Sequence, residues 1–536
     1  MSSFDVIIIG GGHNGLVCAC YLAGAGLKVK VLERRSVVGG AAVTEEFHPG
    51  FRNSVASYTV SLLNPKVIRD LRRAEHGLRI LHRPYAMYMP LPGDNYIRTA
   101  SSTGETQAEF RRFSRRDADR LPAYYDMLEK VADVMREMVL ETPPNVGGGL
   151  ADLWRGLKAG NRIRALSMPE RRDVLDLFAK SAGDMLDYWF ESEPVKALFG
   201  FDSVVGTLAS PYTPGTAYVL LHHVFGEVNG KKGQWGHAVG GMGAITQAMA
   251  AEARARGVDI ELDAPVAQVR VQAGHAGTVV LEDGRECSAR AVAANVNPKL
   301  LYLKLMDQAA LDPEFVERLR RYKCGSGSFR MNVALAELPK FTAAPAGDGG
   351  RHLSAGIIIG PSLRYMEQAF IDARTQGWSR APIIELLVSS TLDDSLAPKG
   401  QHVASLFCQH FNPELPDGGS WDTVKEQAAD LIIDTVDRYA PGFKRSVLGR
   451  MVLSPLDLER KFGLVGGDIF HGALTLDQLY SARPILGYAD YRGPVSGLYL
   501  CGSGAHPGGG VSGAPGHNAA REIIADFRAG KLKRTA

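Results

Sequence analysis

Two glycine clusters stand near opposite ends of the chain, and each follows an apolar run. Residues 6–15 read VIIIGGGHNG, in which Gly10, Gly12 and Gly15 form the pattern G-x-G-x-x-G. Residues 498–520 read LYLCGSGAHPGGGVSGAPGHNAA. Glycine loses more conformational freedom than any other residue when it is ordered, so such clusters indicate a ligand that lies against bare backbone. The first cluster predicts a pyrophosphate held by main-chain amides.

The residues around the first cluster supply the elements that this chemistry needs. A strand, a small-residue helix and a second strand are predicted at residues 6–9, 16–25 and 28–33. In this setting Gly10 makes the tight turn, Gly12 lets a pyrophosphate approach the backbone, and Gly15 lets the helix pack closely. Glu33 ends the second strand, where a carboxylate accepts a hydrogen bond from a ribose hydroxyl and repels a 2′-phosphate. The motif therefore predicts a dinucleotide-type cofactor other than NADP.

A second glycine pair follows this acid in the sequence. The run after the strand includes Arg34, Arg35, Gly39, Gly40 and Ala41. A glycine pair so close to the ribose site suggests a bulky cofactor that continues into the loop beyond the strand. We assign Arg34 to the cofactor site and interpret Arg35 as a surface charge.

Composition describes an ordinary folded protein. The 536 residues are too many for one core, so two domains are expected. Apolar residues make up 45% and charged residues 22%. The 61 basic and 58 acidic residues give a net charge of only +3, and the basic residues are scattered, which argues against a nucleic-acid partner. The basic tail at residues 531–536 is interpreted as a solvated end.

Cysteine spacing and terminal sequence exclude several further classes. The six cysteines, at positions 18, 20, 287, 324, 408 and 501, form no C-x-x-C pair, so neither a redox disulfide nor a metal site is predicted. Cys18 and Cys20 are interpreted as core residues of the first helix. No apolar run reaches the roughly 18 residues of a membrane-spanning helix, and no signal peptide or presequence is seen. We expect a cytoplasmic protein, with peripheral membrane contact left open.

Both glycine clusters and three internal stretches together resemble a known family. The internal stretches are GFRNSVASYTVSLLNP (50–65), GGMGAITQAMAAEARARGVDIELDAPVAQV (240–269) and ELLVSSTLDDSLAPKGQHVASLF (385–407). The chain resembles the phytoene desaturase-like flavoproteins, particularly the branch named for a pyridine nucleotide-disulfide oxidoreductase domain. This resemblance implies FAD as the cofactor. It also implies an α/β fold, in which a Rossmann-type FAD-binding domain is assembled from discontinuous segments. An α+β substrate domain would accompany it, as in amine oxidases and phytoene desaturases.

The resemblance also implies the division of the chain. The FAD-binding domain would comprise residues 1–84, 235–300 and 488–530, and the substrate domain would comprise residues 85–234, which are largely helical, and 301–487.

The same resemblance implies a set of cofactor-binding residues. They are Gly10, Gly12, His13, Asn14, Gly15, Glu33, Arg34, Gly39, Gly40, Ala41, Val266, Gly502, Ser503, His506 and Val511. The backbone at Val266 would hold the adenine, although a core strand explains this valine equally well. Ser503 stands where many related flavoproteins have aspartate, so a carboxylate contact there is not assumed. His506 would lie near the flavin ring and is the one catalytic candidate, with shaping the loop as the alternative.

The family implies an FAD-dependent oxidoreductase that transfers a hydride between the flavin and a small apolar, polyene- or isoprenoid-like substrate. Two alternatives share the fold: an amine oxidase, and a non-catalytic binding or escort protein. Some amine oxidases tether the flavin to a cysteine, but Cys501 lies on a predicted strand, an awkward place for that bond. We found no second G-x-G-x-x-G unit ending in an acid-capped strand, and Gly240 to Gly243 lack that strand. NADH and NADPH are therefore not expected to reduce the flavin.

Several other residues have simpler explanations. The aromatic residues near the end of the helical segment are interpreted as core rather than as a substrate channel: Tyr188, Trp189, Phe190, Phe199 and Phe201. Glu385 interrupts an apolar strand and is better explained by an exposed strand face than by the domain cleft. His222 and His223 lack metal-ligand companions and are interpreted as structural.

Overall fold

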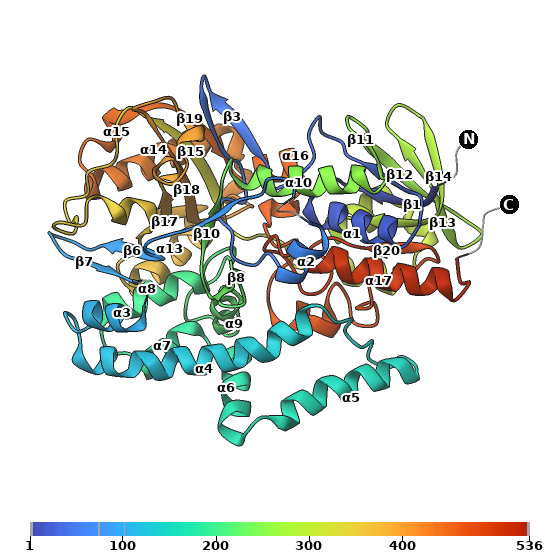
Figure 1. Cartoon of the computed structure of the whole chain (residues 1–536), viewed down its shortest axis with the longest axis horizontal. Coiled ribbons are helices and arrows are strands. Elements are labelled where there is room, and N and C mark those ends of the chain that lie inside the picture. Colours follow the sequence, from blue (N-terminus) through green and yellow to red (C-terminus); the bar gives the residue numbers. More distant parts are fainter. Residues whose placement is uncertain (1–3, 73–74, 101, 533–536) are drawn as a thin grey trace.

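The computed structural model describes residues 4–72, 75–100 and 102–532. A seven-stranded sheet forms the centre of one half of the molecule, on the right in Figure 1. The strands are β1 (Phe4–Ile9), β2 (Val29–Leu32), β11 (Asp259–Glu261), β12 (Val266–Gln272), β13 (His275–Leu281), β14 (Glu286–Ala294) and β20 (Leu498–Leu500). β11, β2, β1, β14 and β20 are parallel neighbours in that order, and the antiparallel hairpin β12–β13 joins the beginning of β14. One sheet thus unites three stretches that lie far apart in the sequence.

Three helices pack together beside this sheet: α1 (His13–Gly24), α10 (Met242–Ala255) and α17 (Ala514–Arg528). The central strand β1 ends in four buried apolar residues, as expected for a strand covered on both faces. Gly15 permits the close approach of α1 to β1, because a Cβ atom there would stand 2.2 Å from the carbonyl oxygen of Gly10. The strand–turn–helix–strand prediction for the N-terminal cluster is confirmed.

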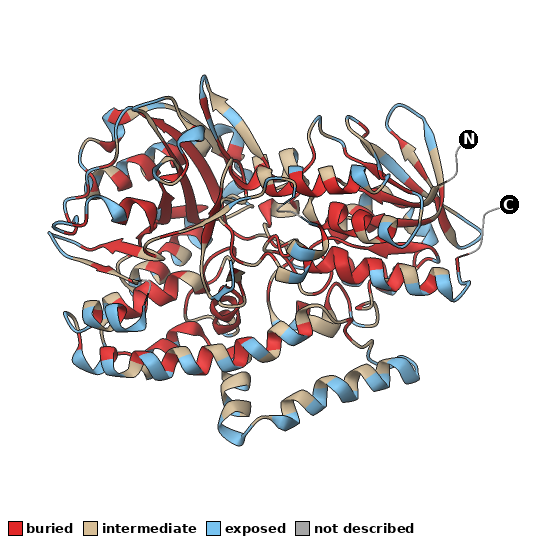
Figure 2. Cartoon of the chain, in the orientation of Figure 1, coloured by how far each residue is buried: buried red, intermediate tan, exposed pale blue. Residues whose placement is uncertain are grey.

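A second seven-stranded sheet forms the centre of the other half of the molecule. Its strands, in spatial order, are β19 (Val447–Leu453), β15 (Phe329–Leu335), β18 (His402–Phe411), β17 (Trp378–Leu387), β16 (Gly356–Ile359), β6 (Met87–Pro90) and β7 (Tyr96–Arg98). All neighbours are antiparallel except β16 and β6. Helices α13 (Leu363–Gln376) and α14 (Trp421–Tyr439) pack on this sheet. Figure 2 shows buried residues concentrated in both sheets.

A helical layer lies below the second sheet in Figure 1. Its helices are α3 (Thr103–Phe110), α4 (Arg115–Val139), α5 (Leu150–Ala165), α6 (Met168–Ala179), α7 (Ala182–Trp189), α8 (Glu193–Gly200) and α9 (Thr216–His222). Helices α3, α4, α6 and α7 each follow a serine whose hydroxyl accepts a hydrogen bond from a first-turn amide. Helix α1 differs, because it begins after Gly12, which has no side chain with which to cap the first turn.

Shorter elements complete the fold. The short strands are β3 (Thr44–His48), β4 (Phe51–Ser54), β5 (Ile80–His82), β8 (Glu227–Val228), β9 (Lys231–Lys232) and β10 (Gly236–Ala238). The short helices are α2 (Pro65–Asp70), α11 (Pro298–Leu300), α12 (Pro313–Arg320), α15 (Phe443–Ser446) and α16 (Pro455–Phe462).

Some sequence predictions need correction. The segment at 85–234 is largely helical, but its strands β6 and β7 join the second sheet. The basic tail is not wholly solvated: Leu532 is buried and its carbonyl oxygen accepts a hydrogen bond from Arg290, while Lys531 pairs with Asp526. Lys533 to Ala536 lie outside the described residues. The limits of the domains stay a prediction.

Candidate functional site

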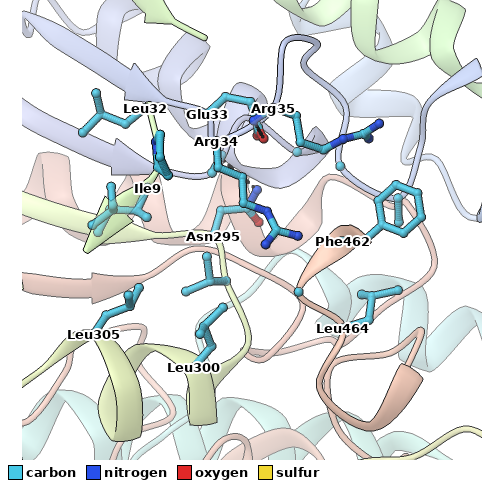
Figure 3. A pocket seen from close by; sticks show the side chains of 18 of the residues that line it. Ile9, Leu32, Glu33, Arg34, Arg35, Asn295, Leu300, Leu305, Phe462 and Leu464 are labelled. Atoms are coloured by element: carbon cyan, nitrogen blue, oxygen red, sulfur yellow. Dashed lines mark hydrogen bonds between the residues drawn. The ribbon is translucent and has the colours of Figure 1, made fainter. Parts of the chain in front are cut away.

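A cavity of about 260 Å³ lies where β1 and β2 end and α1 begins (Figure 3). Nine of the predicted cofactor residues line it: Gly10, Gly12, His13, Glu33, Arg34, Gly40, Ala41, Val266 and Ser503. They come from both ends of the sequence and from the middle. Ser503, from the C-terminal glycine cluster, thus lies at the same cavity as the N-terminal motif.

Glu33 stands just beyond β2 with its carboxylate directed back to the first glycine turn (Figure 3). One carboxylate oxygen accepts a hydrogen bond from the amide of Gly11 (2.7 Å) and the other from the amide of Arg35 (2.9 Å). The side chain is buried but still lines the cavity. A fixed carboxylate in this position can accept hydrogen bonds from the hydroxyl groups of a sugar.

Asn295, which follows β14, holds the glycine turn from the opposite side of the cavity. Its side-chain amide donates to the carbonyl oxygen of Gly10 (3.1 Å). Gly12 itself lines the cavity with bare backbone. A Cβ atom there would stand 2.9 Å from this amide nitrogen. Gly39 needs its own lack of a side chain, since its φ is +128° and a Cβ atom would meet the carbonyl oxygen of Ala42 at 2.7 Å.

The far end of this cavity is apolar on one side and closed by α16 on the other. Ala264, Pro265 and Val266 line the cavity, as do Leu300 and Leu305, which Figure 3 labels. This wall suits a flat aromatic ring.

The arginines that follow Glu33 close the cavity by binding α16 and its neighbours. Arg34 donates to the carbonyl oxygens of Arg460 and Lys461 at 3.1 and 2.7 Å. The prediction that Arg35 is a plain surface charge is wrong, because it pairs with Glu45 and lies over the Phe462 ring.

Four predicted cofactor residues, Asn14, Gly15, Gly39 and Gly502, stand behind the cavity rather than in its lining. Asn14 donates to the hydroxyl of Ser503 (3.1 Å), and the amide of Gly39 donates to the carbonyl oxygen of Gly11 (2.9 Å). These residues hold the two glycine loops against each other. Their predicted role is therefore better described as positioning.

His506 also lies away from the cavities. Its Nε2 is 3.2 Å from the carbonyl oxygen of Met138, at the end of α4, and its ring packs edge-on against Tyr480. Burial lowers the pKa of His506 to about 4. His506 is in the lining of neither the first cavity nor the aromatic cavity, and its contacts are those expected if it shapes the loop. Its place near the flavin ring stays a prediction.

A second cavity, of about 130 Å³, continues from the first, and we call it the aromatic cavity. The two share His13, Ala41, Leu464, His471 and Ser503. The predicted residue Val511 lines the aromatic cavity, as do side chains that the sequence did not single out for the site: Tyr58, Leu62, Val205, Trp235, Phe407, Ile469, Phe470 and His471.

A buried polar cluster stands behind one wall of the aromatic cavity. Tyr58 stacks on Phe407 with ring centres 5.3 Å apart, and its hydroxyl donates to Glu385. The guanidinium of Arg330 lies 4.4 Å from the Tyr58 ring centre and donates to the hydroxyl of Ser405 (2.6 Å).

Glu385 corrects the prediction of an exposed strand face, because only 8% of it is exposed. Burial raises its pKa, while Arg83, the Tyr58 hydroxyl and Arg330 act in the opposite direction. Burial raises the pKa of Tyr58 well above its usual value, and the Glu385 charge adds to this effect. Tyr58 therefore stays protonated at neutral pH and can donate a proton in a hydrogen bond.

Arg483 organises the C-terminal glycine loop, although no sequence pattern marks it. The side chain is fully buried, and its guanidinium donates to the carbonyl oxygens of Phe470 (2.7 Å) and Ser503 (2.8 Å). It also reaches the carbonyl oxygens of Gly472, Ala473 and Gln478. One side chain thus ties the loop at Ser503 to the segment that carries His471.

Three of the four histidines that line the aromatic cavity are uncharged at neutral pH. Burial lowers the pKa of His222 to about 3, and it lowers the pKa values of His223 and His471 to about 4. His222 and His223 were predicted to be structural, but both line this cavity at the end of α9.

Of the other aromatic and cysteine residues that were predicted to lie in the core, some are buried and one is exposed. Phe190 and Phe201 are buried in the helical core, as predicted, whereas Tyr188 is exposed. Cys18, Cys20 and Cys501 are buried in the core of the first sheet, and the Cys18 and Cys501 thiols are hydrogen-bonded. Cys501 lies in the lining of neither cavity, which argues against a flavin tether there.

A sequence profile described as flavin containing amine oxidoreductase matches residues 15–328. The chain belongs to this family. A rat protein named pyridine nucleotide-disulfide oxidoreductase domain-containing protein 2 is 43% identical to it over 98% of this chain and 94% of the rat protein. A phytoene desaturase (lycopene-forming) of Pseudescherichia vulneris is 26% identical over 95% of this chain and 96% of its own.

A solved structure shows the same fold. Cyclohexylamine oxidase from Brevibacterium oxydans aligns over 98% of this chain and 100% of its own, with a TM-score of 0.57 and 17% identity. The chain is an FAD-dependent oxidoreductase with the α/β fold of these flavoproteins.

The cavities fit the flavin cofactor that this family carries. The first cavity offers an apolar wall, a carboxylate for a sugar and a helix start without a side-chain cap, and the adjoining aromatic cavity offers a chamber for a flat ring. Gly12 lines the first cavity, and a Cβ atom there would stand 2.9 Å from the Asn295 side-chain nitrogen, so only a residue without a side chain fits this position. Within residues 4–72, 75–100 and 102–532, no helix is both long and apolar enough to cross a membrane.

Proposed function

We propose that this enzyme transfers a hydride between FAD and an apolar, polyene- or isoprenoid-like substrate, without reduction by NADH or NADPH. The observation that carries this proposal is the chemistry of the aromatic cavity. Among the described residues that line it, none is aspartate, glutamate, lysine or arginine. Three of the histidines in its wall, His222, His223 and His471, are neutral because burial lowers their pKa values. Such a chamber favours a substrate without charge.

A relative supports the same substrate class. The Pseudescherichia vulneris protein carries the name phytoene desaturase (lycopene-forming), and it aligns with nearly the whole chain. Phytoene and lycopene are hydrocarbons, which bring no charged group into a binding site.

The cofactor placement that we propose follows the two cavities in order. Glu33 would accept hydrogen bonds from the adenosine ribose, and the backbone at Val266 would face the adenine. The start of α1 beside Gly12 would hold the pyrophosphate, because amides and the helix dipole favour negative charge there. The isoalloxazine ring would enter the aromatic cavity near Val511.

When bound, FAD would supply the hydride chemistry, and the chain would supply placement and exclusion of water. Tyr58 would face the reaction chamber with its hydroxyl held by Glu385. Arg330 would keep that pair in place, because its guanidinium packs against the Tyr58 ring from behind. Burial lowers the pKa of Arg330 to about 10, so it stays charged at neutral pH and favours the ionised form of Glu385.

The proposal that nicotinamide nucleotides are not used has support at the other candidate glycine cluster. Strand β11 ends in an acid, Glu261, contrary to the sequence expectation, but that carboxylate pairs with Lys30 (2.7 Å) and Arg285 (2.6 Å). The first amides of α10 are bonded to the hydroxyls of Ser54 and Thr44, both at 2.9 Å. Neither the acid nor the helix start is open to a second dinucleotide.

An amine is the second candidate substrate, and one observation favours it. A third cavity, of about 360 Å³, shares His223 and Trp235 with the aromatic cavity and contains Asp202, Tyr124 and Tyr125. A carboxylate among aromatic rings can receive an ammonium group. Burial raises the pKa of Asp202 well above its usual value, and a bound cation would reverse part of that rise.

The test is anaerobic mixing of the oxidised holoenzyme with NADH, with NADPH, with phytoene in detergent and with cyclohexylamine, while the flavin absorbance is followed. We expect bleaching by phytoene and little or none by either nucleotide. Fast bleaching that saturates with nucleotide would refute the absence of nicotinamide use. Bleaching by the amine alone, weakened in Asp202→Asn, would replace the apolar substrate with the second candidate.

A further inference from the structure

Helix α5 presents an apolar face to solvent, in contrast to ordinary surface helices. None of its described residues is buried. Leu150, Leu153, Trp154 and Leu157 are 86, 59, 72 and 56% exposed. Residues spaced by three and four positions share one helix face, so these four side chains form a single stripe, here called the α5 stripe. Figure 1 shows α5 at the lower edge of the molecule. Figure 2 colours this helix as exposed and intermediate.

The opposite, charged face of α5 attaches the helix to the body of the protein. Arg155 pairs with Glu522 of α17 at 3.3 Å. Lys158 and Arg162 bind Glu141, at 2.6 and 2.8 Å. Hydrogen bonds from Arg162 and then Lys158 lower the pKa of Glu141 to about 2, so these pairs persist at neutral pH. Rotating the α5 stripe inward would break them, and the outward orientation is therefore built into the fold.

Helix α5 carries four basic residues and one acidic residue, so its own net charge is positive. Arg164 is exposed at the edge of the α5 stripe and donates to Asn161. The one acid of α5 is Asp152, whose side chain is only 16% exposed and accepts hydrogen bonds from the amide of Asn145 and from Arg155. The apolar surface continues onto the next helix, where Met168 and Leu175 are exposed by 54 and 64%.

We propose that the α5 stripe inserts into the interface of a membrane that contains anionic phospholipids. Leucines and a tryptophan on one face, with basic residues at its edges, are the features of helices that lie in a lipid interface. Anionic headgroups complement the positive edge. A second copy of the chain fits less well, because the α5 stripe offers on the order of 500 Å² per chain, against roughly 800 Å² per partner in a standard interface.

A further cavity lies at the end of α4 from which the chain leads to α5. It has a volume of about 360 Å³ and lies between α2 and the last turns of α4, lined by Leu62, Arg136 and Val139. Residues 140–149 lead from that end of α4 to α5. The exposed side chains of Lys66 and Arg69 line it on the surface side, and His222 and Leu62 line both this cavity and the aromatic cavity. Supply of an apolar substrate from the membrane by this route rests on the proposed function, whereas membrane binding by α5 does not.

The test is co-sedimentation of the full-length holoenzyme with vesicles of phosphatidylcholine alone or of phosphatidylcholine mixed with phosphatidylglycerol. We expect binding to the mixed vesicles that is about tenfold tighter or more than to the neutral ones, and that weakens with added salt. The double variant Leu153→Ser/Leu157→Ser should lose about tenfold or more in vesicle affinity. Tryptophan emission should shift to shorter wavelength on vesicle binding, and Trp154→Phe should abolish most of that shift.

The matched control is Leu448→Ser/Leu476→Ser, which removes two leucines that are 44 and 52% exposed on other elements. It should bind vesicles as the wild type does, and both double variants should retain the visible flavin spectrum. The proposal is overturned if the wild type fails to bind the mixed vesicles, or if the α5 variant binds as well as the control. It is also overturned if the wild type is a dimer that only the α5 variant converts to a monomer, without any vesicle binding. Each readout is independent of substrate turnover.

Discussion

Replacing Glu33 with alanine separates the cofactor contact of this side chain from its structural contacts. The carboxylate accepts two backbone hydrogen bonds, from Gly11 at 2.7 Å and Arg35 at 2.9 Å, neither of which involves the flavin. Loss of these bonds leaves two amides without their partner and should lower the free energy of unfolding by about 2–4 kcal/mol. Loss of the proposed ribose bond affects only FAD binding. At about 1.5–3 kcal/mol for a hydrogen bond to a charged group, the dissociation constant should rise about 10- to 150-fold.

The assay is titration of the flavin-free protein with FAD and, in parallel, with FMN, followed by flavin fluorescence. FMN lacks the adenosine ribose, so Glu33→Ala should weaken FAD binding and leave FMN binding nearly unchanged. Glu46→Ala, at an exposed position on β3 outside the cavity lining, is the matched control and should change neither affinity. Equal weakening of FAD and FMN would show that Glu33 acts only by shaping the glycine turn. Unchanged FAD affinity would refute its place in the site.

Three other perturbations have definite expected outcomes. Gly15→Ala should abolish flavin binding, because its Cβ atom would lie 2.2 Å from the Gly10 carbonyl oxygen. The control is Gly156→Ala on α5, whose Cβ atom meets no described atom within 4 Å and which should keep the flavin. Purification of a yellow Gly15→Ala protein would contradict this reasoning. Arg483→Met should lower the free energy of unfolding by at least about 3 kcal/mol and reduce flavin content, as measured by urea unfolding and absorbance, because several buried carbonyl oxygens lose their donor. Acidification should destabilise the protein. Buried histidines have pKa values of about 3 or 4 in the folded protein, against about 6.5 in the unfolded chain. As the pH falls from 6.5 towards 4, these histidines therefore gain protons only in the unfolded chain, which favours unfolding. Each histidine contributes at most about 1.4 kcal/mol per pH unit in that window and nothing above it, so urea unfolding at equal stability on both sides of pH 6.5 would contradict their burial in the neutral form. The histidines concerned are His222, His223, His410 and His506.

Much of the first cavity could be predicted from the sequence, because the features that form its N-terminal part lie close together in the chain. Glycine spacing, a buried apolar strand and an acid at the end of the next strand are all contained in residues 6–41. The corresponding structure, β1, α1 and β2 with Glu33 at the cavity, needs no information from elsewhere. The C-terminal loop was located by its glycines, but its attachment was not. Arg483 and His471 carry no sequence signal, since their roles arise from carbonyl groups that the fold brings together.

The aromatic cavity and the α5 surface depend on contacts between distant segments. Tyr58, Arg83, Arg330 and Glu385 come from four separate parts of the chain, and no spacing in the sequence relates them. Glu385 was assigned to solvent because an acid in an apolar strand usually faces out, yet both faces of β17 are covered here. A helical wheel would reveal the apolar face of α5 but not its direction, because Glu141 and Glu522, which fix it, lie outside the helix.

The order in which the chain is synthesised has a consequence for how the enzyme acquires its flavin. Strand β20 pairs with β14, and α17 packs on α1, so residues 498–528 complete a sheet and a helical layer whose other members are synthesised earlier. Until they leave the ribosome, β14 has an open edge, α1 lacks a neighbour, and the cavities lack Ser503 and Val511. Cofactor capture is therefore a late event in biogenesis. Flavin shortage should accordingly lower the yield of folded enzyme rather than produce a stable store of empty enzyme, because the unfinished sheet exposes an edge and apolar surface that favour aggregation.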